Sequence, residues 1–179
     1  MDLSNVKEAL SKNKGIDEPL KDNILELVDI FHKTFPEISL DYLCHNLQTL
    51  KVEKTNNFIN HFPLDYNAKL NKLTINRKEI SKEFDTKNLL MNMVIRLIAT
   101  KNGIMGFDTD GSFLALNIGY VAGIANMLVG NDADYDIYTD EMIAANIFGK
   151  VVGDDILKEA FFTNNPSLIF NTMEHKDIW

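Results

Sequence analysis

The chain has 179 residues, of which 45% are hydrophobic, so its length and composition suit one domain, residues 1–179, with a substantial core. It contains a single cysteine, Cys44, which excludes an intramolecular disulfide and a cysteine-based zinc cluster. The first residues carry an early acid and no apolar run, so we expect no secretory signal and a cytoplasmic location.

The net charge of −8 is distributed unevenly. Residues 1–101 hold 15 basic and 14 acidic residues, a net +1, whereas residues 102–179 hold 3 and 12, a net −9. An acidic surface repels phosphate backbones, so we expect no nucleic-acid binding. The acidic second half is interpreted as a solubilising face or as a docking surface for a basic partner.

The first half predicts helices followed by short strands. Residues 1–18 are charged and suit a loose N-terminal arm or helix. Apolar residues at helical spacing predict a helix over 20–31, and a shorter pattern predicts another over 39–47. Alternating apolar and polar residues predict strands near 50–53 and 70–75, joined through a loop over 56–67.

The second half predicts helices throughout. One begins at Asp85 or Thr86 and ends near Lys101, and others cover 139–152, 154–162 and the residues after Asn165-Pro166. The predicted fold class is therefore α+β, a predominantly helical single domain with a small β-sheet.

Residues 112–130 contain no charge, and we interpret them as a buried central helix rather than a membrane span. Glycines interrupt the segment, and Asn117 and Asn126 lie within it, where each needs a hydrogen-bonding partner. We expect Gly119 and Gly123 to let another backbone pass close to this helix.

Motifs for phosphate cradling, dinucleotide binding and a serine nucleophile are absent from the sequence, and we expect no cofactor. Asp132, Asp134 and Asp136 give the D-x-D-x-D opening of a calcium loop. The loop lacks the sharp-turn glycine and has Ile143 at its twelfth position, so it is a weak candidate cation site.

From about Leu50 to Phe170 the order of elements resembles a small bacterial zincin-like metallopeptidase domain. The resemblance rests on the strand ending LTIN, the helix LLMNMVIRLIAT, the later GSFLALNIG helix, and the residues Tyr138, Thr139, Asp140 and Glu141 with the helical tail that follows them. In that family the first helix carries H-E-x-x-H, whose two histidines bind zinc while the glutamate activates water, and the next helix supplies a glutamate ligand within Asn-Glu-Gly.

In this chain the resemblance places the H-E-x-x-H window on Asn92, Met93, Val94, Ile95 and Arg96, and the later window on Asn117, Ile118 and Gly119. Every residue that would perform the chemistry is thus replaced. Amide, thioether and aliphatic side chains are poor zinc ligands, and the guanidinium of Arg96 opposes a dication. A buried Arg96 would itself need a partner, such as an acid from the second half or Asn117.

The sequence therefore favours a pseudoenzyme: a non-catalytic zincin-like module, without metal, that binds a peptide or protein, in a groove along a strand edge, or acts in regulation. Two alternatives stay open, an acidic interaction protein that docks on a basic partner and an enzyme with an unrecognised carboxylate site. We expect neither nucleic acid nor membrane as a partner, and the oligomeric state stays open.

Overall fold

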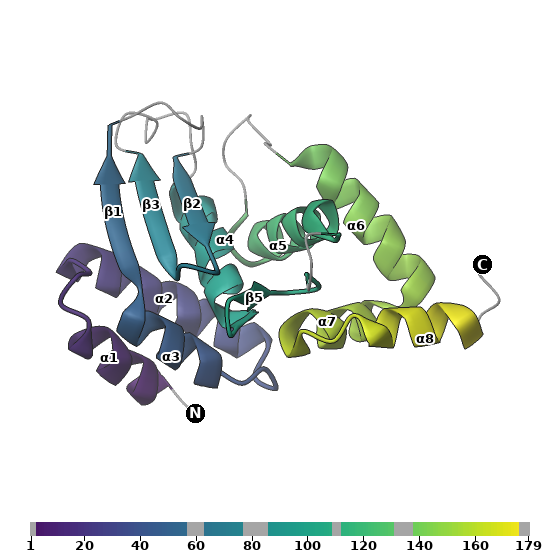
Figure 1. The fold of residues 1–179 in the computed structure, drawn as a ribbon, viewed down its shortest axis with the longest axis horizontal. Helices are drawn as coiled ribbons and strands as arrows, with labels where there is room; N and C mark the ends of the chain where they lie inside the picture. The colour runs from purple at the N-terminus through teal and green to yellow at the C-terminus, as the bar shows by residue number, and fades with distance from the viewer. Residues whose placement is uncertain (1–2, 57–62, 77–85, 109–111, 131–137, 176–179) are drawn as a thin grey trace.

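The computed structural model describes residues 3–56, 63–76, 86–108, 112–130 and 138–175, and it has an α+β fold in which helices predominate. Figure 1 shows a three-stranded sheet in front of α2 and α4, with α5 to α8 on one side of it. The helices are α1 (Leu3–Lys12), α2 (Glu18–Thr34), α3 (Asp41–Thr49), α4 (Thr86–Ile98), α5 (Leu114–Val129), α6 (Thr139–Val152), α7 (Asp154–Thr163) and α8 (Ser167–His175). The strands are β1 (Lys51–Thr55), β2 (Leu64–Asn67), β3 (Lys72–Asn76), β4 (Thr100–Lys101) and β5 (Ile104–Met105).

The N-terminal segment forms a docked helix, α1, where the sequence left an arm or a helix open. Its residues Val6, Ala9 and Leu10 are buried in the main core. Asn13, which follows α1, is buried and donates from Nδ2 to the carbonyl oxygens of Leu47 and Leu50, at 2.8 and 2.9 Å. The segment is therefore held by apolar burial and by two buried hydrogen bonds.

The sheet has the strand order β1-β3-β2. Strands β1 and β3 are parallel, and β2 pairs with β3 in the antiparallel direction with Leu64 opposite Ile75. The prediction of a loop over 56–67 is wrong at residues 64–67, which form β2. The strand has only one period of alternation, with Tyr66 buried and Asp65 exposed, which is too short to stand out from its polar surroundings.

Helix α4 is buried from Leu90 to Ile98 except at Arg96, and it lies against β2. The predicted start at Thr86 agrees with the structure, while Asp85 lies outside the described residues. The predicted end near Lys101 is wrong, because the helix ends at Ile98 and Lys101 belongs to β4. The helix leads into a β4–β5 hairpin whose turn residues Asn102 and Gly103 have φ of 52° and 79°. Positive φ at both positions is characteristic of a two-residue type I′ turn.

The uncharged segment forms α5, as predicted, with Val121 and Ala125 fully buried. None of the helices in the described part of the chain has the length and hydropathy that a membrane crossing requires. Asn126 has the hydrogen-bonding partner that was predicted for it, because its Oδ1 accepts from Nδ2 of Asn88 at 2.6 Å.

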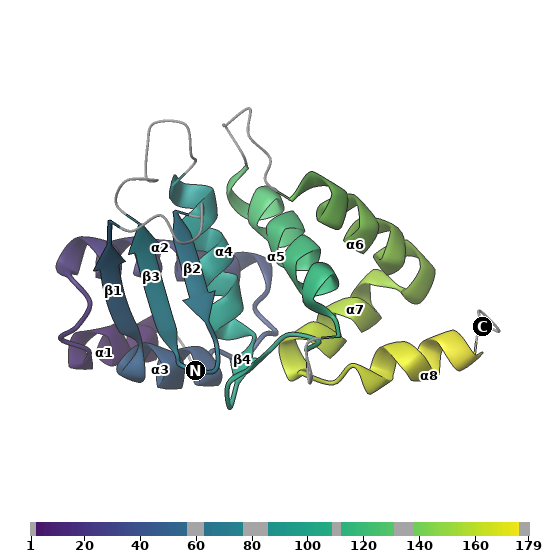
Figure 2. The ribbon, with the colours of Figure 1, turned by 45° about the horizontal axis from the view of Figure 1, so that its top comes forward.

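Helix α6 packs closely on α5 at Gly119, as predicted. A Cβ built at Gly119 would lie 1.9 Å from the carbonyl oxygen of Glu141 in α6. The same expectation is wrong for Gly123, since a Cβ there would have no atom within 4 Å. Figure 2 shows α5 and α6 side by side along their lengths.

Helices α6 and α7 are separated by Gly153, where the sequence predicted the break. Phe161 of α7 meets the rings of Phe107 and Tyr120, with ring centroids 5.1 and 4.9 Å away. This aromatic cluster joins the C-terminal helices to α5 and to the segment that follows the β4–β5 hairpin.

The two α5 glycines provide a matched test of the α5–α6 contact. Gly119→Ala is expected to lower the free energy of unfolding by about 1–3 kcal/mol or more, because its methyl group would overlap backbone atoms of α6. Gly123→Ala is expected to raise it by up to about 1 kcal/mol, because alanine favours helix and has open space there. Urea unfolding of both variants measures the difference, and equal effects would contradict the close approach.

Candidate functional site

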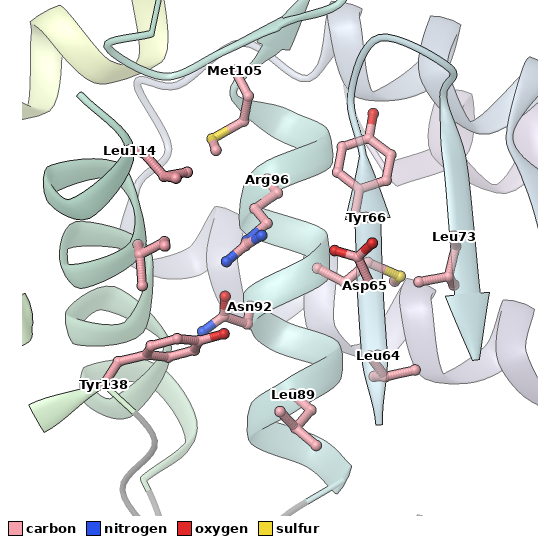
Figure 3. Close-up of a pocket in the computed structure, with 12 residues that line it drawn as sticks. Leu64, Asp65, Tyr66, Leu73, Leu89, Asn92, Arg96, Met105, Leu114 and Tyr138 are labelled. Atoms are coloured by element: carbon pink, nitrogen blue, oxygen red, sulfur yellow. The ribbon is translucent and has the colours of Figure 1, made fainter. Parts of the chain in front are cut away.

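A cavity of about 220 Å³ lies between β2, α4 and α5 (Figure 3). In Figure 3 the side chains of α4 point into the space between β2 on one side and α5 on the other. The residues that line the cavity are Leu64, Asp65, Tyr66, Leu73, Leu89, Asn92, Met93, Arg96, Met105, Leu114, Ile118 and Tyr138. Most of these side chains are apolar, so the few polar groups stand out as candidates for recognition.

The cavity brings together four of the six positions that the resemblance selected. Asn92, Met93 and Arg96 lie on one face of α4, where residues three and four positions apart are neighbours. Ile118 faces them from α5. The two windows therefore meet across one space, although twenty residues of sequence, 97–116, separate them.

The other two positions point elsewhere. Asn117 is completely buried, and its Oδ1 accepts from the backbone N–H of Phe107 at 2.9 Å. Gly119 packs against the backbone of α6 at Glu141. Asn117 therefore holds the chain after the hairpin, and the expectation that it partners Arg96 is wrong.

Arg96 has its hydrogen-bond partner in Tyr138, the residue that precedes α6. Within the described residues no acceptor reaches its buried Nε, and none of the ion pairs there includes Arg96. Arg96 is half-buried, and a guanidinium that is partly withdrawn from water without a carboxylate partner favours an anion that reaches it. Positive charge in the last turn of a helix also suits the helix dipole of α4.

Tyr138 is the functional residue that sequence reasoning missed. Burial raises the pKa of its phenol, and the nearby carboxylates of Asp65 and Glu141 raise it further, while the charge and hydrogen bond of Arg96 lower it. The hydroxyl is therefore protonated at neutral pH and serves as a hydrogen-bond donor. The tyrosine belongs to a segment that carries part of the resemblance, but sequence reasoning assigned it no role, because it reaches the cavity only through the packing of α6 on α5.

Asp65 and Asn92 complete the polar part of the cavity. Asp65 lies on β2, and Figure 3 shows its carboxylate on the opposite side of the cavity from Tyr138. Asn92 is buried, with 8% of its surface exposed. Its amide supplies both donors and an acceptor beside Arg96.

Strand β2 presents backbone groups on its outer edge. The N–H of Asn76 donates to the carbonyl oxygen of Pro63 at 2.9 Å, so this pair is a hydrogen-bonded one. Since such pairs alternate along an antiparallel ladder, Asp65 and Asn67 bond to β3, whereas Leu64 and Tyr66 direct their N–H and C=O groups away from it. In the described part of the chain, β2 pairs with β3 alone.

The cavity does not fit a zinc ion. Its side chains at the window positions are an amide, a thioether, a guanidinium and an aliphatic group, and zinc sites use imidazole, thiolate or carboxylate ligands. Among the described residues no group of three or more His, Cys, Asp and Glu is placed to hold a metal.

The remaining sequence candidates are the weak cation loop and a carboxylate site. Asp132, Asp134 and Asp136 lie outside the residues that the structure describes. The pKa values of Glu8 and Glu37 are lowered, chiefly by hydrogen bonds from Lys12 and Lys158. Both are surface groups that line none of the cavities described, so they give no support to a carboxylate enzyme.

Comparison of the chain with protein-family models, with curated protein sequences and with solved structures finds no match.

The electrostatics of the cavity predict opposite effects of two substitutions on the pKa of Tyr138. Arg96→Gln removes a charge and a hydrogen bond that lower this pKa, so the pKa is expected to rise. Asp65→Asn removes a charge that raises it, so the pKa is expected to fall. NMR titration of ¹³Cζ-labelled tyrosine, with Tyr138→Phe for assignment, measures both shifts, and shifts of the same sign would contradict this arrangement.

Proposed function

We propose that this protein is a non-catalytic, zincin-like module that binds an extended segment of another polypeptide along the outer edge of β2. The observation that carries the proposal is the position of this edge beside the cavity. An extended chain that pairs with Leu64 and Tyr66 would form backbone hydrogen bonds with β2 and direct alternate side chains toward α4.

The lining of the cavity supports binding rather than hydrolysis. Leu89, Met105, Leu114 and Ile118 offer apolar surface to the side chains of a bound segment. Peptide hydrolysis by a zincin requires a metal-bound water, and the side chains at the window positions cannot hold the metal. The residues present can bind and orient a chain.

The zincin-like interpretation can be tested by restoring the ligands. Asn92→His, Arg96→His and Ile118→Glu together are expected to create a site for one zinc ion, because these three positions line one cavity and two of them lie one helical turn apart. Isothermal titration calorimetry with zinc measures binding, and elemental analysis of the unmodified protein is expected to show substoichiometric zinc.

The matched control for that experiment is the double variant Asn92→His with Arg96→His, which lacks the third ligand and should bind zinc more weakly. A folded triple variant that binds zinc no better than the double variant would show that the positions do not have zincin geometry. Stoichiometric zinc in the unmodified protein, together with cleavage of an unstructured protein, would refute the non-catalytic function.

Binding at the β2 edge can be tested with a neutral-centred peptide, acetyl-KLTQTLK-amide. Leu64→Pro removes an outward N–H from β2, and the loss of one backbone hydrogen bond is expected to weaken binding about threefold to tenfold. Leu64→Ala keeps the N–H while it shortens the side chain, so it is the control for the loss of apolar contact.

The measurement is the dissociation constant from calorimetry, together with the NMR shifts of the amides of Leu64 and Tyr66. Circular dichroism confirms that both variants are folded. Equal weakening by proline and alanine, or peptide-induced shifts that exclude β2, would contradict strand addition at this edge.

A further inference from the structure

The cavity contains a cation that the described protein leaves without a carboxylate partner. Arg96 takes part in none of the ion pairs between described residues, although Lys87 of the same helix pairs with Glu26 at 2.9 Å. Its Nε is buried and lacks an acceptor there. Arg96 is half-buried, and the cost of partly removing its guanidinium from water would be offset by a bound carboxylate, since two parallel N–H donors match the two carboxylate oxygens.

The groups beside Arg96 are also suited to a carboxylate. Tyr138 offers a phenolic hydroxyl that is protonated at neutral pH, and Asn92 offers an amide N–H₂. All three residues line the same cavity and supply donors. Asp65 lines the cavity on the β2 side, opposite Tyr138. Its negative charge repels a bound carboxylate that lies close to it, and therefore disfavours that position for the anion.

The geometry of strand addition determines which position of the bound segment would carry the acidic side chain. In a strand paired with β2, alternate side chains point toward α4 and neighbours on one face are about 6.6 Å apart. Figure 3 shows α4 alongside β2, with Leu89 near one end of the cavity, Asn92 and Arg96 between, and Met105 and Leu114 at the other end. The central side chain of the bound strand would therefore meet Arg96. The side chains two positions before it and two positions after it would meet apolar groups.

We infer that the bound segment carries the pattern apolar-x-acid-x-apolar, with the carboxylate of a Glu or Asp side chain bound by Arg96, Asn92 and Tyr138. The two apolar side chains pack against Leu89 at one end and against Met105 and Leu114 at the other. This inference rests on the proposed function, because strand addition at β2 sets the spacing. Arg96 is thus the residue that selects the sequence of the partner.

The test compares acetyl-KLTETLK-amide with its glutamine counterpart acetyl-KLTQTLK-amide by calorimetry on the full chain. The glutamate peptide is expected to bind about tenfold more tightly or better, the range for a hydrogen-bonded charge. Arg96→Gln should remove this preference, so that both peptides bind with similar affinity. Lys87→Gln removes the same charge from α4 outside the cavity and should preserve the preference.

A third peptide, KLTQTLK with a free C-terminus, separates an acidic side chain from a chain terminus as the source of the carboxylate. It is expected to bind no better than its amidated form, and tighter binding would overturn the assignment to a side chain. If both amidated peptides bind at β2 with equal affinity, the inference fails while the proposed function stands. If neither binds, both fail.

Discussion

The C-terminal end of α4 is the constraint on which the rest of the structure depends. A helix end leaves carbonyl oxygens without intrahelical partners, and here distant asparagines donate to one of them, that of Leu97, and to two carbonyl oxygens just past the helix. Nδ2 of Asn46 donates to the carbonyl oxygens of Leu97 and Thr100, at 2.9 and 2.8 Å, and Nδ2 of Asn164 donates to that of Ala99 at 3.0 Å. The helices before and after α4 are thereby fixed to the same point, and the face of α4 that carries Arg96 is fixed with them.

The position of Tyr138 shows how packing far from the cavity determines its chemistry. Gly119 lets the backbone of α6 approach α5, and Tyr138 immediately precedes α6. Its carbonyl oxygen accepts from the N–H of Met142, within the same first turn of α6. A residue without a side chain in α5 thus controls where a phenol lies relative to Arg96, and the donors of the cavity depend on the contact between two helices.

Sequence reasoning predicted much of this arrangement and missed parts of it for physical reasons. Helical periodicity and the breaks at Gly and Pro predict the helices, and the resemblance to a zincin-like domain implies that the two windows on α4 and α5 meet. Strand β2 was not predicted because four residues give too short an alternation. The role of Tyr138 was not predicted because only tertiary packing brings this residue to the cavity. Asn117 was assigned to the wrong partner, since helical position does not show that its oxygen is already bonded to Phe107.

The length of the turn in the β4–β5 hairpin determines which residue lines one end of the cavity. A two-residue turn at Asn102-Gly103 sets the register that places Thr100 opposite Met105, and Met105 lines the cavity. Because successive strand residues face opposite sides, a turn one residue longer would exchange Met105 for a neighbour without any change in α4 or β2. Turn length is therefore a simple means by which evolution or design could alter which apolar residue the cavity accepts, leaving the charged centre intact.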